Sequence, residues 1–391
     1  MRRPALLAIA FALLLGAPGS LAPAQGPGAI LVLRLHQVPD QSPDLTLLRV
    51  DPVTVTEDGG SLALGQETVM GWAYSPDRSQ LALGGSSLRI VDVGSLRLVR
   101  ELSTRDGGVP NVLAWPAPNR LLVVEYSPGL KFVVLDPTTG KVVSKRRMRG
   151  DQLDVARAGN SVVFLMAPLN RVGATRLVVG GPDGTLRGIA LRQIIGGRHF
   201  RREGAGQIRD PGLAVDQSGN RAYVVGAPGP IAEVDLGTLA FKYHYLLAPA
   251  KNLSGDARHA RWLGNGMLAV AGYHYTSSHV GAPTGLRLVD TRTWRTVTLD
   301  PAAGWFLSTD SGVVTVDGSE LTTYSLDGRR LLEAHFDQPF GSVDSLGGYL
   351  YDWDFSAKTM RVVDLSNGSI LRRAPADDYL QLIGERDSIG R

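Results

Sequence analysis

Short runs of alternating apolar and polar residues, separated by turn residues, recur along almost the whole chain. One repeat comprises four such runs, at residues 70–75, 80–84, 87–91 and 96–101, with Pro, Asp, Arg and Ser at the first turn. A period of two is that of a β-strand, and Pro, Asp, Ser and Gly favour tight turns. The pattern therefore predicts an all-β protein built from four-stranded units.

An apolar run that ends in Asp recurs eight times, at an average spacing of about 45 residues. The copies are at Asp51, Asp92, Asp136, Asp183, Asp235, Asp290, Asp327 and Asp364, and the copy at Asp183 is degenerate. We expect each Asp to cap the turn between the third and fourth strands of a unit, because Asp accepts the hydrogen bonds of such a turn. Short strands at this period are typical of the blades of a β-propeller.

The two ends of the chain resemble two parts of one unit. Residues 29–64 supply strands two to four with no inner strand before them, and residues 379–388 match an inner strand and a turn with nothing after them. Joining them completes a blade and removes the unpaired edges of an open array. We predict a single β-propeller closed by its N- and C-terminal strands. Eight blades are favoured, and seven is the alternative if the degenerate copy or residues 29–64 do not form a blade.

Two stretches resemble known propeller repeats. The segment Ser75-Pro-Asp-Arg-Ser-Gln-Leu-Ala82 resembles the turn of WD40-like and TolB-like repeats. The segment Val133-Val-Leu-Asp-Pro-Thr-Thr-Gly-Lys-Val-Val143 is similar to the YVTN and quinoprotein-amine-dehydrogenase-like repeat. The resemblance implies the fold and no particular activity, because propellers of this kind carry unrelated functions.

The N-terminus has the features of a signal peptide. Arg2 and Arg3 precede an apolar run of 11 residues, 5–15, and Ala22-Pro-Ala24 places small residues where a signal peptidase cleaves. We expect residues 1–24 to be removed and residues 25–391 to form the propeller, in the periplasm or outside the cell. The run is shorter than the roughly 20 residues of a spanning helix, so no transmembrane segment is predicted.

Composition narrows the chemistry. The chain has no Cys, which excludes disulfides and Cys-ligated metals. A net charge of +4 and an isoelectric point of about 9.3 indicate mild attraction to anions, and we expect no nucleic-acid binding. The motifs Gly-x-Ser-x-Gly, His-Glu-x-x-His, Gly-x-x-x-x-Gly-Lys and Gly-x-Gly-x-x-Gly are absent. We therefore predict no catalytic residue, metal or cofactor.

The longest connections, residues 192–210, 167–175 and 273–284, belong to the two loop classes that share one rim of a propeller. Long loops on one face of a repeat array commonly mark the binding side. The first connection is basic, residues 145–149 are a second basic segment, and the third connection is rich in His and Tyr. The candidate ligand-binding residues are Arg198, Arg201, Arg202, Tyr273, His274 and His279.

Two functions follow from these observations. The first is a noncatalytic binding module for an anionic envelope component, a polysaccharide or a partner protein, since guanidinium groups suit carboxylate and phosphate. The alternative is an enzyme, such as a lactonase, lyase or oxidoreductase, with its site at the mouth of the central channel. Convergent His, Arg and carboxylate groups at that mouth favour the enzyme, and an apolar or Gly-lined mouth favours the binding module.

Overall fold

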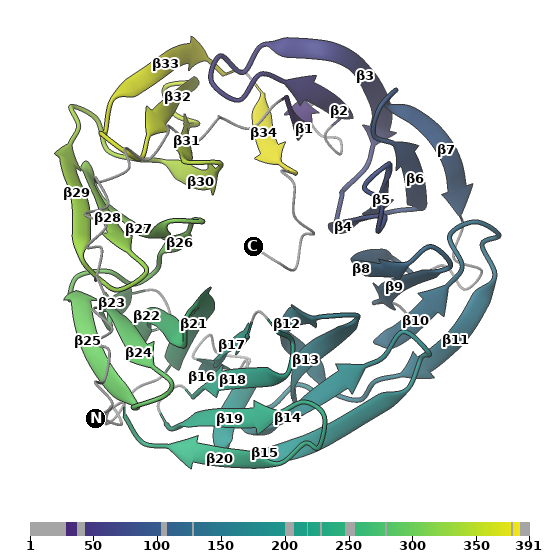
Figure 1. Cartoon of the computed structure of the whole chain (residues 1–391), viewed down its shortest axis with the longest axis vertical. Coiled ribbons are helices and arrows are strands. Elements are labelled where there is room, and N and C mark those ends of the chain that lie inside the picture. Colours follow the sequence, from purple (N-terminus) through teal and green to yellow (C-terminus); the bar gives the residue numbers. More distant parts are fainter. Residues whose placement is uncertain are drawn as a thin grey trace, which may run out of the picture.

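The computed structural model describes residues 29–36, 44–102, 108–126, 129–199, 207–216, 218–226, 229–246, 255–277, 280–376 and 378–383. Every regular element in these ranges is a β-strand, and the strands form seven sheets around a central axis (Figure 1). The all-β prediction is confirmed, and the fold is a β-propeller. The predicted signal segment, residues 1–24, lies outside the described residues. Within them, no helix is long and apolar enough to cross a bilayer.

Six of the sheets have four strands each. The first contains β1 (Ile30–His36), β2 (Asp44–Val50), β3 (Glu57–Gln66) and β34 (Tyr379–Leu382). The second contains β4 (Gly71–Tyr74), β5 (Gln80–Gly84), β6 (Leu88–Asp92) and β7 (Arg97–Leu102). The third contains β8 (Pro110–Ala117), β9 (Arg120–Glu125), β10 (Lys131–Leu135) and β11 (Val142–Arg147). Each sheet is an antiparallel arrangement of neighbouring strands, as tight turns between successive strands require.

The other three four-stranded sheets follow the same plan. One contains β17 (Gly212–Val215), β18 (Arg221–Val225), β19 (Ile231–Asp235) and β20 (Phe241–His244). The next contains β26 (Leu307–Ser308), β27 (Gly312–Asp317), β28 (Glu320–Ser325) and β29 (Arg330–His335). The last contains β30 (Ser342–Leu346), β31 (Tyr349–Asp354), β32 (Thr359–Asp364) and β33 (Ile370–Pro375).

The seventh sheet has ten strands and joins two four-strand runs. The first run is β12 (Asp151–Ala158), β13 (Ser161–Ala167), β14 (Gly173–Gly180) and β15 (Leu186–His199). The second is β21 (Gly255–Gly264), β22 (Met267–Ser277), β24 (Leu286–Asp290) and β25 (Arg295–Asp300). The two remaining strands are β16 (Gln207–Asp210), which links the runs, and β23 (Val280–Pro283), which pairs with β22.

The sheet count differs from the prediction of eight or seven separate blades, because only six four-stranded sheets stand alone. The reason is the length of β15, whose 14 residues extend beyond its pairing with β14. Its last residues pair with β16, and β16 in turn pairs in parallel with the start of β21. Long-range pairing of this kind has no signature in the local repeat pattern.

The predicted turn role of the repeated Asp is confirmed. All eight Asp residues lie at the connection between the third and fourth strands of a run. Asp92 is typical, since its carboxylate accepts hydrogen bonds from the backbone amide of Ser95 at 2.7 Å and from the Ser95 hydroxyl at 2.6 Å. The Ser95 hydroxyl and amide lower the pKa of Asp92. Side-chain capping of the turn explains why the motif recurs.

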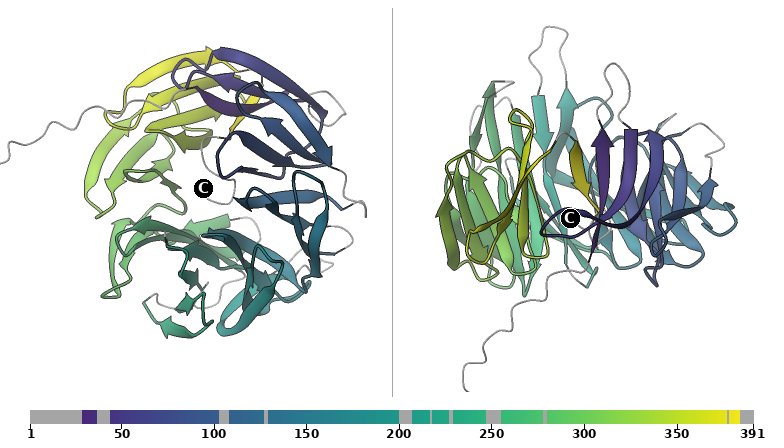
Figure 2. Two further views of the ribbon diagram at one scale, coloured as in Figure 1. Left: turned by 45° about the vertical axis from the view of Figure 1, so that its right-hand side comes forward. Right: turned by 90° about the horizontal axis from the view of Figure 1, so that it is seen from above.

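The predicted closure of the ring is also confirmed. β34 pairs antiparallel with β1, with Leu382 opposite Val32 and Gln381 opposite Leu33. The two strands come from opposite ends of the chain and lie side by side in Figure 1 and in both views of Figure 2. The innermost strand of the first sheet is therefore supplied by the C-terminal part of the chain.

The described residues form eight hydrophobic clusters, each between neighbouring four-strand runs. Alternate residues of one strand enter different clusters. Leu81 and Leu83 of β5 pack toward the first sheet, whereas Ala82 between them packs toward the third. A strand whose successive side chains point to opposite faces can serve both neighbours in this way.

Candidate functional site

The connections of the ring fall into two sets on opposite rims. Because successive strands run antiparallel, turns between first and second strands share a rim with turns between third and fourth strands. We call this the turn rim. The opposite loop rim carries the connections between second and third strands and those between consecutive runs. Figure 2 shows the ring edge-on.

The loop rim contains a cavity of about 610 Å³. It lies where β9–β10, β11–β12 and β13–β14 connect, so both loop classes contribute to it, as the loop analysis anticipated. Four arginines line it, and we call it the arginine cavity: Arg147, Arg149, Arg171 and Arg176. Its apolar lining includes Met148 and Met166, which are 6% and 2% exposed.

Close backbone contacts fix the shape of this cavity. Gly150 has a φ of 111°, and a Cβ at this position would lie 2.1 Å from the carbonyl oxygen of Ala167. Any side chain would therefore push the β11–β12 connection away from the end of β13. Asp151 accepts a hydrogen bond from the backbone amide of Asn170 at 2.7 Å. This bond ties the β13–β14 loop to the start of β12.

The charge of the cavity is unbalanced. Within the described ranges, none of the four arginines forms an ion pair with a carboxylate. The neighbouring cation Lys145 differs, because its ammonium lies 2.7 Å from the carboxylate of Glu125, which is buried. Leu169, which is 64% exposed, also lines the cavity. The cavity thus combines concentrated positive charge with apolar surface.

Arg198, a basic residue predicted from the sequence, is not among the residues that line this cavity. Arg198 lies near the end of β15, and its guanidinium is 3.0 Å from the carboxylate of Asp210 on β16. This ion pair offsets the charge of Arg198. Arg201 and Arg202 lie outside the described residues. The sequence indicated residues 145–149 and 167–175 separately, and the tertiary structure brings these two segments together around one cavity.

His274 belongs to a packed polar network. Nδ1 of His274 lies 2.6 Å from a carboxylate oxygen of Asp256, which has no exposed surface. The other oxygen of Asp256 is 2.9 Å from the guanidinium of Arg258. Burial raises the pKa of Asp256, and the charges of Arg258 and His274 oppose that rise. The network links β21 and β22 beside the junction with β16.

Tyr273 packs closely against the backbone, since a Cβ at Gly304 would lie 2.1 Å from Cζ of its ring. Burial raises the pKa of the Tyr273 hydroxyl. His279 lies outside the described residues. Asp256 was not predicted from the sequence. The Asn265-Gly266 turn could have indicated it, because a hairpin with this turn places Asp256 opposite His274 or one residue away from that position.

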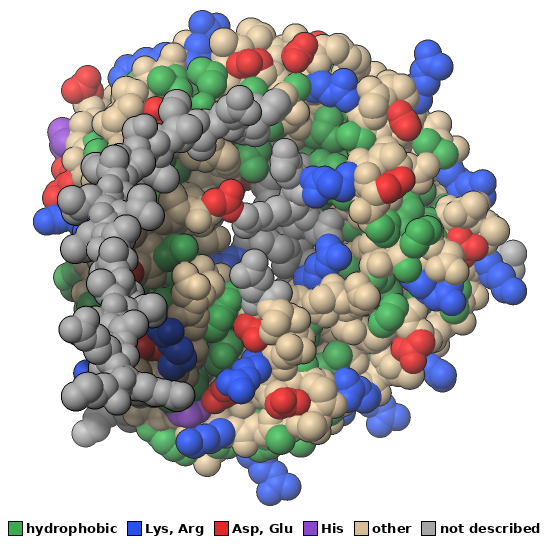
Figure 3. Space-filling model, viewed as in Figure 1, with side chains coloured by type: hydrophobic (Ala, Val, Ile, Leu, Met, Phe, Trp, Pro, Cys, Tyr) green, Lys and Arg blue, Asp and Glu red, His purple; other side chains and the backbone are tan. Residues whose placement is uncertain are grey.

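The described part of the central channel carries charged side chains. A hollow of about 960 Å³ extends along β12, β17 and β21, with Asp154, His259 and Arg261 among its lining residues. Burial raises the pKa of Asp154 to about 6, although two backbone amides donate to its carboxylate. Figure 3 shows a face hollowed at its centre, with acidic and basic side chains around the hollow. By the criterion stated above, this composition favours chemistry in the channel.

The described residues contain no group of three or more His, Cys, Asp or Glu side chains placed to hold a metal ion. What they define is a β-propeller with a cationic cavity on its loop rim and a polar central channel. No family model matches the chain, and no curated protein matches it in sequence. The resemblance to WD40-like and YVTN repeats therefore stands only for the propeller fold.

Solved structures match over most of the chain. Dihydro-heme d1 dehydrogenase NirN, solved in complex with DHE, is 14% identical with a TM-score of 0.59, over 92% of this chain and 75% of that one. Apo AztD from Citrobacter koseri is 12% identical with a TM-score of 0.54, over 91% and 99% of the two chains. A second structure of Citrobacter koseri AztD has 11% identity and the same TM-score, over 91% and 98%. At such identities the likeness shows the fold alone.

Proposed function

We propose that this chain is an exported, eight-bladed β-propeller that binds anionic groups of the cell envelope in its arginine cavity. The observation that carries the proposal is the convergence of Arg147, Arg149, Arg171 and Arg176 on one cavity with no carboxylate partner among the described residues. Guanidinium groups that line one cavity repel one another, and a bound anion relieves that repulsion. Each also presents a planar fork that fits phosphate or carboxylate.

The size of the cavity limits the ligand. A volume of about 610 Å³ lies within the range of small-molecule pockets and admits a charged head group or one unit of a polymer, not a folded domain. The buried methionines and the exposed Leu169 suit an anion that carries some apolar surface. The signal-peptide pattern of residues 1–24 supports an extracytoplasmic location, where such envelope components occur.

Three repeated features support a count of eight blades. Eight hydrophobic clusters lie between neighbouring four-strand runs of the described residues. Eight Asp-capped turns connect the third and fourth strands of these runs. The ten-stranded sheet also contains two complete four-strand runs. We therefore count that sheet as two blades joined through β16.

The test compares two quadruple variants. One replaces the four cavity arginines by Gln. The control replaces Arg97, Arg100, Arg372 and Arg373, which are exposed on the outer strands β7 and β33 and form no ion pair within the described ranges. Both lower the formal net charge of the chain from +4 by the same four units. Retention is measured on immobilised polyphosphate and immobilised polygalacturonate, at low and high salt.

We expect the unmodified protein to be retained at low salt and released as salt rises, because salt screens the ion pairs. The cavity variant should lose at least about tenfold in affinity and the control less than about twofold, since ion pairs with a fitted anion exceed diffuse attraction. Comparing the two matrices distinguishes phosphate from carboxylate. An equal loss in both variants would show that net charge, not the cavity, binds the matrix, and would refute the proposal.

A third variant tests the loop that the sequence indicated. Replacing Arg198, Arg201 and Arg202 together by Ser should leave stability within about 0.5 kcal/mol, as exposed loop substitutions usually do. Retention should fall, but less than in the cavity variant, because Arg198 is already paired with Asp210. A larger loss than in the cavity variant would move the binding site to residues 192–210.

A further inference from the structure

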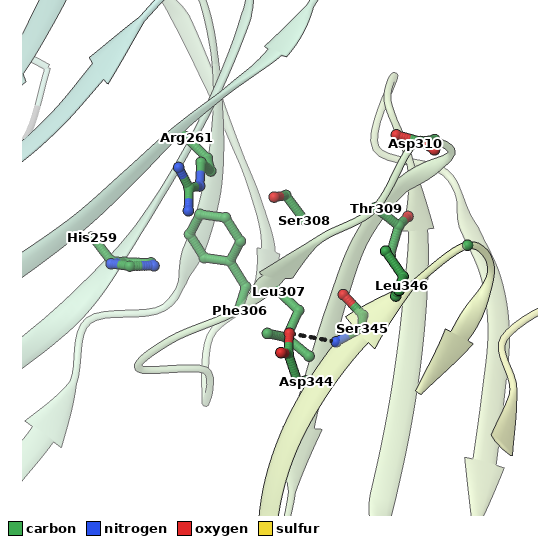
Figure 4. A pocket seen from close by; sticks show the side chains of 11 residues that line it. His259, Arg261, Phe306, Leu307, Ser308, Thr309, Asp310, Asp344, Ser345 and Leu346 are labelled. Carbon is green, nitrogen blue, oxygen red and sulfur yellow. Dashed lines mark hydrogen bonds between the residues drawn. The ribbon is translucent and has the colours of Figure 1, made fainter. Parts of the chain in front are cut away.

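A second, smaller cavity of about 200 Å³ lies beside the channel, on the inner strands of three neighbouring runs. It is bordered by β21, by the short β26 with the turn that follows it, and by β30 (Figure 4). β26 has only two residues, whereas β21 has ten and β30 has five. The short inner strand covers less of the channel wall, and this leaves the gap between β21 and β30.

The two side walls of this cavity carry opposite charges. His259 and Arg261 come from β21 on one side, and Asp344 comes from β30 on the other (Figure 4). Burial, together with the charge of Arg261, lowers the pKa of His259, so the imidazole is neutral at pH 7. The positive charge of that wall is therefore the guanidinium of Arg261. One oxygen of Asp344 accepts a hydrogen bond from the backbone amide of Ser345 at 2.8 Å.

Between the charged walls, β26 and the residues on either side of it contribute the apolar side chains of Phe306 and Leu307 and the polar side chains of Ser308, Thr309 and Asp310. Phe306 is 2% exposed, and its ring packs edge-on against His259 with centroids 5.4 Å apart. Leu307 and Leu346 also line the cavity. Access comes from the channel, because this cavity shares His259, Arg261 and the 308–310 segment with the 960 Å³ hollow.

We propose that this cavity binds a small zwitterion with an apolar substituent, of the size and chemistry of an apolar α-amino acid. Arg261 receives the carboxylate, Asp344 receives the ammonium group, and Phe306 with the leucines contacts the apolar substituent. A volume of about 200 Å³ is below the range of pockets for drug-sized ligands and excludes a polymer. This site is separate from the arginine cavity, since it lies on the inner strands, and it does not rest on the proposed envelope binding.

The test uses leucine and two derivatives that each lack one charge. Leucine amide keeps the ammonium group and lacks the carboxylate, whereas N-acetylleucine keeps the carboxylate and lacks the ammonium group. Binding to the full mature chain is measured by calorimetry. We expect each derivative to bind at least about tenfold more weakly than leucine, because it forms one charge-assisted contact fewer in the cavity.

Two isosteric variants assign the contacts. Arg261→Gln should remove the preference for leucine over leucine amide and keep the preference over N-acetylleucine. Asp344→Asn should do the reverse. The urea unfolding transition, followed by tryptophan fluorescence, should be nearly unchanged in both variants, which shows that they are folded without relying on the arginine cavity. Leucine binding that is undetectable, or that neither variant alters in this selective way, overturns the proposal.

Discussion

Closure of the ring by β34 rests on two side chains that can be tested separately. Leu382 is 1% exposed and belongs to the cluster that contains Val32 and Trp353. Ile383 has no exposed surface and belongs to the cluster on the other side of the first sheet, which contains Trp72. Leu382, the last residue of β34, and Ile383, the residue after it, therefore pack toward the two different neighbours of the first blade.

Leu382→Ala and Ile383→Ala should each lower the free energy of unfolding by about 2–5 kcal/mol, the usual range for truncating a buried Leu or Ile. The two side chains enter different clusters but are adjacent in the chain, so the double variant should lose more stability than either single variant, with coupling between the two effects. A typical domain has a total stability of about 5–15 kcal/mol. Deleting everything after Ala376 removes both side chains and the pairing with β1, and should be at least as damaging as the double variant.

The assay is equilibrium unfolding in urea, followed by tryptophan fluorescence. Trp353 and Trp72 lie in the two clusters concerned, so the summed fluorescence of the six tryptophans includes one reporter in each cluster. The control is Leu371→Ala on β33, which makes the same chemical change at a side chain that is 40% exposed. Its effect should stay below about 1 kcal/mol, because little apolar area is lost from the core.

The outcome that would contradict this reasoning is simple to recognise. If Leu382→Ala and Ile383→Ala shift the urea midpoint no more than Leu371→Ala does, β34 contributes no core. An unchanged unfolding transition after deletion beyond Ala376 would likewise show that the ring does not depend on closure.

Two further predictions concern charge. Hydrogen bonds from Ser95 and Thr139 lower the pKa values of Asp92 and Asp136 in the folded state. The two carboxylates therefore stabilise the fold fully above their unfolded pKa of about 4. This stabilisation is lost as the pH falls through their folded-state pKa values. Asp92→Asn with Asp136→Asn should therefore reduce the loss of stability between pH 6 and pH 3 in urea unfolding, and a pH dependence equal to that of the unmodified protein would contradict the capping role. Arg361→Met should lower stability by about 3–5 kcal/mol because it leaves Asp352 buried without its partner at 2.5 Å, and adding Asp352→Leu should restore part of the loss. If the double variant is no more stable than Arg361→Met, the unpaired charge of Asp352 is not the cause of the loss.

The sequence by itself determined the features that arise within one repeat. Alternation of apolar and polar residues predicted the strands, because it is the period of a strand. The recurring Asp predicted the outer turns, because its carboxylate bonds to amides two or three residues away, as Asp92 does to Ser95. The incomplete repeats at the two termini predicted the pairing of β34 with β1, since an unpaired edge is unfavourable.

The tertiary structure alone decided how the repeats combine. The pairing of β15, β16 and β21 joins segments some 50 residues apart, and the local pattern gives no signal for it. The arginine cavity needs Arg147 and Arg171 from different runs, and the channel cavity needs Arg261 opposite Asp344. Alternation specifies which face a side chain occupies, but not which distant side chain it meets, because that depends on how the strands and loops pack in three dimensions.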